Sequence, residues 1–305
     1  MLFVVYCKHT LYKEDFPMIL RQDIQMRDPY VVLIDGKYYL YGTTDKNCWA
    51  EKATGFDAYV SEDLEHFEGP FPIFRPDADF WADRNFWAPE MHIYRGEYYL
   101  FASFKAEGVC RGTQILKADN PLGPFKPWSD GPVTPRNWEC LDGTLHVDED
   151  GQPWIVFCHE WQQIKNGTMC VLPLTEDLRA AEGEAVTLFS ASDPKWVAPA
   201  PLPDTYVTDG PFLYRTKEGE LIMLWSTYCE TGYAITYAES LSEGVLGPWK
   251  QQDKPLFDRD GGHGMLFTDK NGQLMLSIHT PNDTPNERPI FLPVKDTGKG
   301  LERMQ

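Results

Sequence analysis

The chain has 305 residues and a formal net charge of −18 at pH 7. A surface this acidic repels a phosphate backbone, so nucleic acid is not expected as a partner. Hydrophobic residues make up 42% of the sequence, which argues against intrinsic disorder. No apolar run approaches the roughly 20 residues of a membrane-spanning helix, so no membrane partner is expected either.

The N-terminus and the cysteines bear on the cellular compartment. Residues 1–9 contain a short apolar stretch that ends at Lys8 and His9, without the basic start or the small-residue cleavage site of a secretory leader. The seven cysteines are scattered and include no C-x-x-C pair, which favours buried reduced thiols over a disulfide framework or a zinc ribbon. We therefore expect a cytoplasmic protein, or a secreted one if an unseen leader precedes the assigned start.

Turn-forming residues are dense along the whole chain. Gly and Pro number 24 each, and after residue 16 the longest stretch without either is 154–166. Few helices of ordinary length fit between such breakers. The apolar runs are short and rich in aromatic and β-branched residues, which is typical of strands. Five of these runs lie at 38–41, 98–101, 154–157, 221–225 and 274–278.

The five runs belong to an internal repeat. Each follows a polar turn that contains glycine, and each turn follows another short apolar strand. The turn glycines are Gly36, Gly96, Gly151, Gly219 and Gly272, with a spacing of about 60 residues that suits one four-stranded sheet plus loops.

Five such units predict an all-β fold, a five-bladed β-propeller. The alternative is a β-sandwich, whose strand pairs would not be expected to repeat this regularly over the whole chain. We place the propeller at 22–295, between an N-terminal extension at 1–21 and a C-terminal tail at 296–305.

Five short motifs stand just before the first strand of each unit. They are Arg27-Asp28-Pro29, Trp87-Ala88-Pro89-Glu90, Leu141-Asp142-Gly143-Thr144, Thr208-Asp209-Gly210-Pro211 and Gly261-Gly262-His263-Gly264. The innermost strands of a propeller begin at one end of the central channel, so these motifs are expected to face one shared cavity. Asp-Pro and Asp-Gly are also ordinary turn dipeptides, but their recurrence in successive units favours a functional site.

The motifs contain acids and no recognisable nucleophile. The sequence has no serine-hydrolase elbow, no zinc-protease motif, no P-loop and no dinucleotide-binding loop. Hydrolysis of a glycosidic bond needs one protonated and one ionised carboxyl group. A third acid nearby can hold up the pKa of the protonated one by like-charge repulsion. Asp28, Asp142 and Asp209 are residues of the required kind.

This pattern resembles glycoside hydrolase family 43 over roughly residues 22–295. The motif at 27–29 looks like the blade-one motif of that family, and the motif at 87–90 looks like its blade-two motif. The resemblance implies a five-bladed propeller that cleaves α-L-arabinofuranosidic or β-D-xylosidic bonds in plant-derived oligosaccharides and polysaccharides, with inversion. It implies that Asp28 is the general base, Asp209 the general acid and Asp142 the modulator of the acid's pKa.

Four further residues are candidates for substrate binding: Trp87, Glu90, His263 and Arg288. Glu90 either contacts the substrate or has a structural role beneath the site. Arg288 follows the last strand, and it either returns to the cavity to hold a sugar hydroxyl or forms a surface ion pair. Trp49, Trp161 and Trp225 are, like Trp87, candidates for stacking on sugar faces or for packing in the core.

His263 also bears on metal binding. It resembles the family's blade-five histidine, which points into the channel towards a calcium ion or a water. No cofactor is expected to be required, and a structural calcium with His263 as a ligand is a candidate. The expected partner is an arabinose- or xylose-containing oligosaccharide, while the oligomeric state does not follow from the sequence.

One position departs from the family pattern. The family's acid is usually Glu in a T/S-E-G-P motif, whereas this chain has Asp209, whose carboxyl would sit about 1.3–1.5 Å further back, roughly one C–C bond. A misplacement of about 1 Å can cost around 100-fold in rate. Either Asp209 is the acid with a compensating shift, or Glu90, Glu139 or Glu160 replaces it, or the protein binds carbohydrate without cleaving it.

A further hypothesis concerns a related propeller family. Trp138-Glu139-Cys140 is similar to a segment of the invertase-like family 32, in which the glutamate is the acid/base. On that hypothesis the protein would hydrolyse fructosides, with Glu139 as its acid/base.

Overall fold

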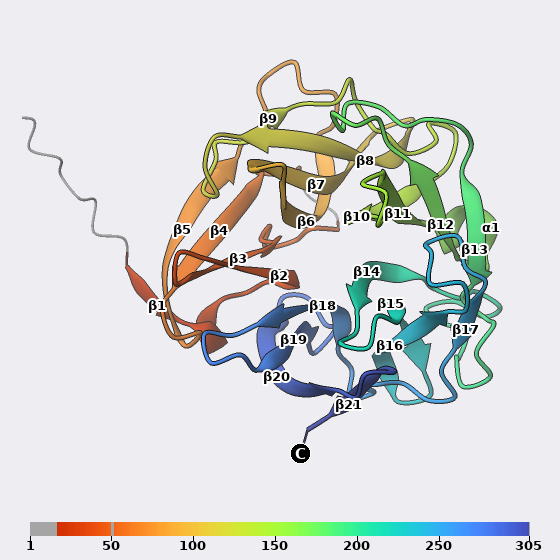
Figure 1. The fold of residues 1–305 in the computed structure, drawn as a ribbon. Coiled ribbons are helices and arrows are strands. Elements are labelled where there is room, and N and C mark those ends of the chain that lie inside the picture. Colours follow the sequence, from red (N-terminus) through yellow and green to blue (C-terminus); the bar gives the residue numbers. More distant parts are fainter. Residues whose placement is uncertain (1–16, 50–51, 305) are drawn as a thin grey trace, which may run out of the picture.

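The computed structural model describes residues 17–49 and 52–304. They form five antiparallel sheets around a central axis, the blades of a five-bladed β-propeller (Figure 1). Helical structure among these residues is limited to α1 (Trp161–Ile164) and the 3-10 turn η1 (Arg21–Asp23). The predictions of an all-β fold and of five blades are confirmed.

Each blade consists of consecutive strands, with the first strand of the repeat innermost. Blade 1 contains β2 (Arg27–Ile34), β3 (Lys37–Thr43), β4 (Phe56–Ser61) and β5 (His66–Phe74), with β1 (Met18–Leu20) added outside β5. Blade 2 contains β6 (Arg84–Tyr94), β7 (Glu97–Ala106), β8 (Val109–Ala118) and β9 (Lys126–Pro127). Blade 3 contains β10 (Cys140–Val147), β11 (Pro153–His159), β12 (Thr168–Pro173) and β13 (Val186–Ser190).

The remaining two blades repeat this order. Blade 4 contains β14 (Asp209–Arg215), β15 (Leu221–Cys229), β16 (Gly232–Ser240) and β17 (Trp249–Gln251). Blade 5 contains β18 (Gly262–Thr268), β19 (Leu274–Thr280), β20 (Arg288–Asp296) and β21 (Leu301–Arg303).

The predicted glycine turns join the first two strands of every blade. All five turn glycines have positive φ, from 75° at Gly36 to 95° at Gly219, a conformation that costs glycine nothing. In blade 1, Asp35 also has positive φ, and Ile34 pairs with Lys37 across a two-residue loop. Such a turn matches the twist of the flanking strands. Blade 2 has the same two-residue loop, whereas the inner hairpins of blades 3 to 5 have five-residue loops that contain the glycine.

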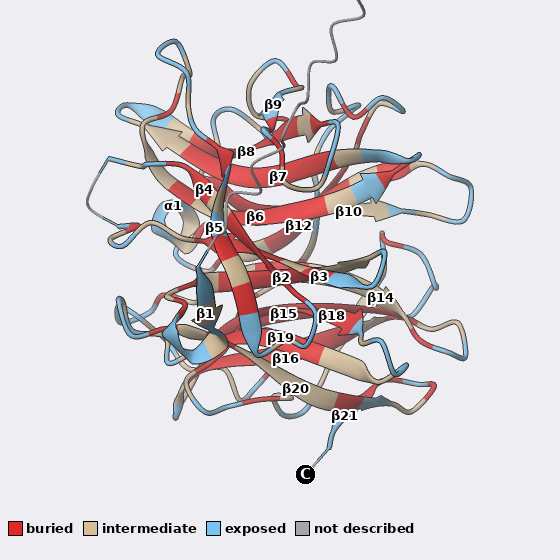
Figure 2. Cartoon of the chain, turned by 90° about the vertical axis from the view of Figure 1, so that its left-hand side faces the viewer, coloured by how far each residue is buried: buried red, intermediate tan, exposed pale blue. Residues whose placement is uncertain are grey.

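Blades pack against one another through the buried middle parts of their strands, whereas exposed residues gather at strand ends and loops (Figure 2). Blades 1 and 2 share a cluster of phenylalanines, with Phe104 at its centre. Its ring centroid lies 4.8–5.9 Å from those of Phe56, Phe74, Phe80 and Phe86. Edge-to-face contacts at these distances stabilise the packing beyond the area they bury.

The described ring closes between blade 5 and blade 1 by hydrogen bonds and not by a shared sheet, because β1 joins blade 1 and β21 joins blade 5. The Ser277 hydroxyl donates to the carbonyl of Pro29 at 2.8 Å, and the Arg21 guanidinium donates to the carbonyl of Pro289 at 3.1 Å.

The propeller therefore extends beyond the predicted 22–295 at both ends. Strands β1 and β21 have three residues each, too few to give a recognisable alternation in the sequence. Most of the predicted N-terminal extension at 1–21, including the apolar stretch in residues 1–9, lies outside the described residues.

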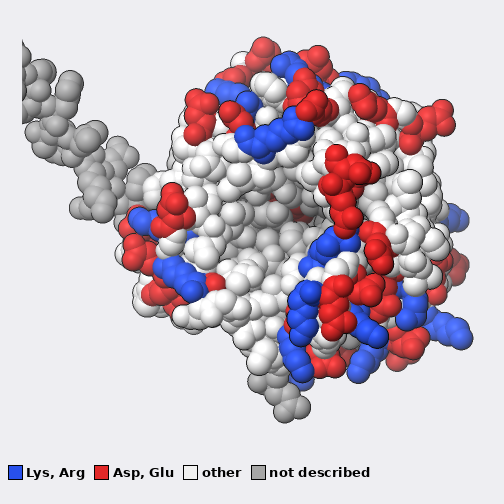
Figure 3. All heavy atoms as spheres, in the orientation of Figure 1, with Lys and Arg blue, Asp and Glu red and all other residues white. Residues whose placement is uncertain are grey.

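The six cysteines of the described part are free thiols, and four of them are buried. In that same part, no helix has the length and apolar character to cross a membrane. Figure 3 shows one face of the propeller, on which acidic and basic side chains lie next to each other around the edge and uncharged atoms surround a central hollow. Such a mixed surface does not favour a phosphate backbone; the exclusion of nucleic acid stays a prediction.

The phenylalanine cluster gives a test of the packing. Phe104→Ala should lower the free energy of unfolding by about 3–5 kcal/mol, because it removes a fully buried ring and leaves a cavity. Denaturant unfolding followed by tryptophan fluorescence measures this change. The matched control is Val186→Ala at a side chain that is 45% exposed, with an expected effect within about 0.5 kcal/mol. Equal losses in the two variants would contradict the packing described.

Candidate active site

The inner strand of every blade contains a β-bulge at the same place. The register shifts between Arg27 and Tyr30, Trp87 and Glu90, Leu141 and Thr144, Asp209 and Phe212, and Gly262 and Met265. The first unpaired residue of each bulge has positive φ: Asp28 (56°), Ala88 (45°), Asp142 (56°), Gly210 (51°) and His263 (47°). Bulges re-aim side chains, and strained non-glycine residues of this kind gather at functional sites.

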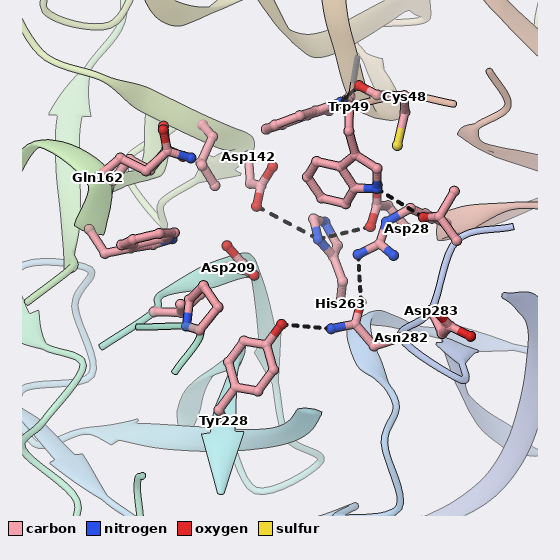
Figure 4. Close-up of a pocket in the computed structure, with 18 residues that line it drawn as sticks. Asp28, Cys48, Trp49, Asp142, Gln162, Asp209, Tyr228, His263, Asn282 and Asp283 are labelled. Atoms are coloured by element: carbon pink, nitrogen blue, oxygen red, sulfur yellow. Dashed lines mark hydrogen bonds and ion pairs between the residues drawn. The ribbon is translucent and has the colours of Figure 1, made fainter. Parts of the chain in front are cut away.

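These bulges bring predicted site residues into one cavity of about 430 Å³ (Figure 4). Its volume lies in the range of small-ligand sites. Asp28, Asp142, Asp209, Trp87 and His263 all line it, so the sequence motifs do converge as predicted. Trp49 and Trp161 also line the cavity, whereas Trp225 is fully buried in the core between blades 3 and 4.

His263 lies between the aspartates. Its Nδ1 is 3.1 Å from Oδ1 of Asp28 and 3.6 Å from Oδ2 of Asp142. In the view of Figure 4, Asp28 and Asp209 lie on opposite sides of the imidazole. Glycine is required at 210, because an added Cβ would lie 2.7 Å from Cδ2 of His263.

The surroundings of Asp28 favour its ionised form. Burial by itself would raise the pKa of this carboxyl, but the electrostatic effects of His263 and Arg27 act in the opposite direction. His279 and the Thr43 hydroxyl, which donates to Oδ2 at 2.6 Å, lower the pKa further. The net effect is a pKa below the ordinary value, so Asp28 is a carboxylate that can accept a proton.

Asp209 is shifted in the opposite direction. Burial and the nearby charge of Asp142 raise its pKa to about 7. His263 and the Tyr233 hydroxyl, which donates to Oδ2 of Asp209 at 2.9 Å, partly offset this rise. The cavity therefore combines an ionised carboxylate with a carboxyl group that keeps its proton near neutral pH, the pairing used for acid/base catalysis.

Asp142, the third acid of the cavity, is buried. Burial and the charge of Asp28 raise its pKa well above the ordinary value, while a hydrogen bond from the Gly210 amide acts against this rise. That amide donates to Oδ2 of Asp142 at 3.0 Å. Asp142 thus contacts the strand that carries Asp209 through the backbone.

Two predicted substrate-binding residues lie elsewhere. Glu90 is buried outside the cavity lining, and its carboxylate lies 3.1 Å from Nε2 of His92. This placement favours the structural role over substrate contact. The expectation that Arg288 reaches the cavity is wrong. Its guanidinium donates to the backbone carbonyls of Gln22, Pro285 and Glu287, because η1 and the loop before β20 place these acceptors beside it.

The other candidate acids are paired with cations. Glu139 lies outside the cavity lining and accepts hydrogen bonds from Lys105 at 2.7 Å and from the Arg111 amide at 2.8 Å. Burial would raise its pKa, but these contacts lower it overall, which does not suit a proton donor. Glu160 lines the cavity and pairs with Arg111 at 3.3 Å. The hypothesis of a family 32-like fructosidase required Glu139 as the acid/base. Because Glu139 lies outside the cavity lining, the structure does not support that hypothesis.

A polar wall of the cavity was missed in the sequence. Arg27 donates to Oδ1 of Asn282 at 2.6 Å, and the Asn282 amide donates to the Tyr228 hydroxyl at 2.9 Å. Arg27 stands inside a predicted motif, but Tyr228 and Asn282 come from the end of β15 and from the loop after β19. No local pattern marks these two positions, because only the closure of the ring brings them beside Arg27.

The residues at His263 do not by themselves form a calcium site. Calcium takes six to eight oxygen ligands, and the described residues contain no cluster of three or more His, Cys, Asp or Glu side chains suited to a metal. Nδ1 of His263 already faces Asp28. Calcium in the channel stays a prediction, with His263 as its candidate ligand.

Fold and site together define a propeller-type glycoside hydrolase with paired carboxyl groups. The chain belongs to glycosyl hydrolases family 43, whose family model matches residues 19–300. This confirms the resemblance found in the motifs, and with it an O-glycoside hydrolase rather than another class of propeller protein.

Several known proteins are similar to the chain. The crystal structure of an endo-arabinase from Bacteroides thetaiotaomicron VPI-5482 is 40% identical, with a TM-score of 0.84 over 92% of this chain and 98% of that one. The extracellular exo-α-(1→5)-L-arabinofuranosidase of Cellvibrio japonicus is 22% identical over 79% of this chain and 68% of its own length. The extracellular endo-α-(1→5)-L-arabinanase 1 of Bacillus subtilis is 24% identical over 46% of this chain, which spans 45% of that relative.

The hydrogen bond from Tyr233 to Asp209 gives a pH test. Tyr233→Phe removes a donor that favours the ionised form of Asp209, so the pKa of Asp209 should rise above about 7. Hydrolysis that needs protonated Asp209 would then persist to higher pH. With Asp209 as the predicted acid and Asp28 as the predicted base, the alkaline limb of the kcat/KM profile should move upwards, while the acid limb stays in place. An alkaline limb that is unchanged or moves downwards would contradict this role.

Proposed function

We propose that the protein hydrolyses α-L-arabinofuranosidic bonds in arabinan-derived oligosaccharides or polysaccharides, with inversion at the anomeric carbon. The observation that carries this proposal is the opposite pKa shift of Asp28 and Asp209 within one cavity. Similarity to two arabinan-cleaving enzymes and to an endo-arabinase structure favours arabinose over xylose. β-D-Xylosidic bonds are the alternative, since a xylosidase/arabinosidase of Bacteroides ovatus is also similar.

The proposed reaction is a single displacement. Ionised Asp28 takes a proton from water as the water oxygen bonds to the anomeric carbon. Protonated Asp209 gives its proton to the leaving oxygen as the glycosidic bond breaks. The water proton ends on Asp28 and the Asp209 proton on the leaving alcohol, and exchange with solvent restores both groups.

Asp142 contributes to the raised pKa of Asp209. After burial, repulsion from ionised Asp142 is the largest contribution to the raised pKa of Asp209. The pKa of Asp142 is itself raised, so this repulsion comes from the fraction of Asp142 that is ionised. An unassisted aspartate would be almost fully ionised at pH 7 and could not protonate a leaving group. The high pKa of Asp209 therefore supports its role as a shortened general acid in the position where the family usually has glutamate.

The cavity walls suit a sugar ring. Arg27 and Asn282 present hydrogen-bonding groups on one side, and tryptophans present flat faces on another. Trp87 is fixed in place, since its indole N–H donates to the carbonyl of Cys48 at 2.8 Å and the Arg111 guanidinium lies 3.7 Å from its ring centroid. Trp49 is 51% exposed and stands at the rim. A few polar groups among aromatic walls are typical of small-ligand sites.

The base assignment is tested with Asp28→Asn. This variant keeps the shape of the side chain but cannot accept the proton, so kcat should fall by about 10²–10⁴-fold. Assays use p-nitrophenyl α-L-arabinofuranoside, p-nitrophenyl β-D-xyloside and linear arabino-oligosaccharides, and proton NMR identifies the first anomer released. The matched control is Asp150→Asn in an exposed turn, which should behave like the parent. Full activity of Asp28→Asn would refute the assignment.

The acid assignment is tested with Asp209→Asn and a series of leaving groups. A good leaving group such as dinitrophenolate needs little protonation, whereas the alcohol of an oligosaccharide needs much. The variant should lose about 10²–10⁴-fold in rate on oligosaccharides and far less on the dinitrophenyl glycoside. Equal losses on both substrates would contradict the acid role. A parent that turns over no glycoside but binds oligosaccharides in calorimetry would instead be a non-catalytic carbohydrate-binding propeller.

A further inference from the structure

A ring of side-chain acceptors holds the bulges in place. In four of the five blades, a residue on the second strand accepts a hydrogen bond from the backbone N–H of the next blade's bulge. Thr43 accepts from Ala88 at 2.8 Å, Ser103 from Asp142 at 2.8 Å, Ser226 from His263 at 2.7 Å and His279 from Asp28 at 3.2 Å. These contacts connect four pairs of neighbouring blades at the level of the active site, all except blades 3 and 4.

The acceptors occupy one structural position. Each pairs across the hairpin with the residue just before the bulge of its own blade, as Thr43 does with Arg27 and Ser226 with Asp209. Each also stands seven residues after the turn glycine of its blade, as Thr43 does after Gly36. The same position in blade 3 is Cys158, seven residues after Gly151 and paired with Leu141.

Blade 3 breaks the pattern. Cys158 is fully buried, and a thiol is a weak acceptor compared with a hydroxyl or an imidazole nitrogen. The Gly210 amide of the next blade, which the pattern would direct to position 158, donates instead to Oδ2 of Asp142 at 3.0 Å. A buried N–H needs a partner, and the carboxyl oxygen of Asp142 supplies one.

We propose that Cys158 is a positioning residue, which withholds a strong acceptor from the Gly210 amide and thereby leaves this amide to Asp142. The inference rests on the proposed function of Asp142 and Asp209. Position 158 faces the bulge of blade 4, and blade 4 carries Asp209, the proposed acid. The exception in blade 3 therefore lies where it can affect that acid. The bond joins the pKa-tuning aspartate directly to the backbone beside Asp209.

This contact matters for the protonation of the acid. The Gly210 amide favours ionised Asp142, and the charge of Asp142 raises the pKa of Asp209. A hydroxyl at position 158 would compete for the amide, as Ser103 and Ser226 do for the amides that they bind. Asp142 would then be more often neutral, and the pKa of Asp209 would fall.

The bland alternative is that Cys158 only fills space. It belongs to the core cluster of blades 3 and 4, where its sulfur lies 3.9 Å from that of Met169. Two substitutions separate the hypotheses. Cys158→Ser adds an acceptor at nearly constant volume, whereas Cys158→Ala removes the thiol without adding one. Cys170→Ser, at another buried thiol of blade 3, controls for burying a hydroxyl.

The first measurement is the pH profile of kcat/KM on p-nitrophenyl α-L-arabinofuranoside. Cys158→Ser should move the alkaline limb down by about 0.5–1 pH unit, through loss of one hydrogen bond to a charged group. Cys158→Ala and Cys170→Ser should keep the parent profile, even where their Tm falls. Identical profiles for Cys158→Ser and Cys158→Ala would overturn the proposal. Should the serine variant not fold, Cys158→Thr supplies the same acceptor with a methyl group.

A second measurement is independent of turnover. Carbon-13 NMR titration of the aspartate carboxyls in the full chain should show a higher pKa for Asp142 and a lower pKa for Asp209 in Cys158→Ser than in the parent. Unchanged titrations would refute the positioning role even if the protein hydrolyses arabinosides. Shifted titrations in a protein that turns over no glycoside would refute the proposed function and leave the positioning role standing.

Discussion

Three aspartates share one buried cavity, and like charges at such close range cannot all be ionised at neutral pH. The site resolves this conflict by unequal surroundings. Asp28 is next to Arg27, His263, His279 and a donating hydroxyl, so it carries the charge. Asp209 has fewer stabilising partners, so it retains a proton up to a pKa of about 7. The proposed division of labour between base and acid follows from this asymmetry.

The asymmetry is built on a symmetric scaffold. Every blade offers the same bulge near the start of its inner strand, and in four blades a neighbouring side chain accepts the amide of the next bulge. Function enters where the repeat is varied. An aspartate, an alanine, a histidine and a glycine occupy equivalent bulge positions, and Cys158 replaces the expected acceptor in blade 3. The fold thus supplies fixed positions, and single residues decide the chemistry at each.

Much of this was predictable, because local patterns carry it. Glycine turns repeat at nearly constant spacing, and the acids recur just before the inner strands, so the propeller and the convergence of Asp28, Asp142 and Asp209 could be expected. The prediction for Arg288 was wrong, because hydrogen bonds to nearby backbone carbonyls hold its guanidinium outside the cavity. Tyr228 and Asn282 had no local signal. The acceptor residues do have a local signal, since each stands seven residues after a turn glycine. What they bind depends on contacts between blades, which the signal does not reveal.

The sequence by itself determined the blade count, the strand pairs and the kinds of residue that reach the channel, because turn propensity and strand alternation act over a few neighbouring residues. Only the tertiary structure decided which acid is charged. A pKa depends on burial and on nearby charges and hydrogen bonds. At Asp209 these come from four blades: Asp28 from blade 1, Asp142 from blade 3, Tyr233 from blade 4 and His263 from blade 5. Their distances are set by how the ring closes, and no stretch of the chain encodes that locally.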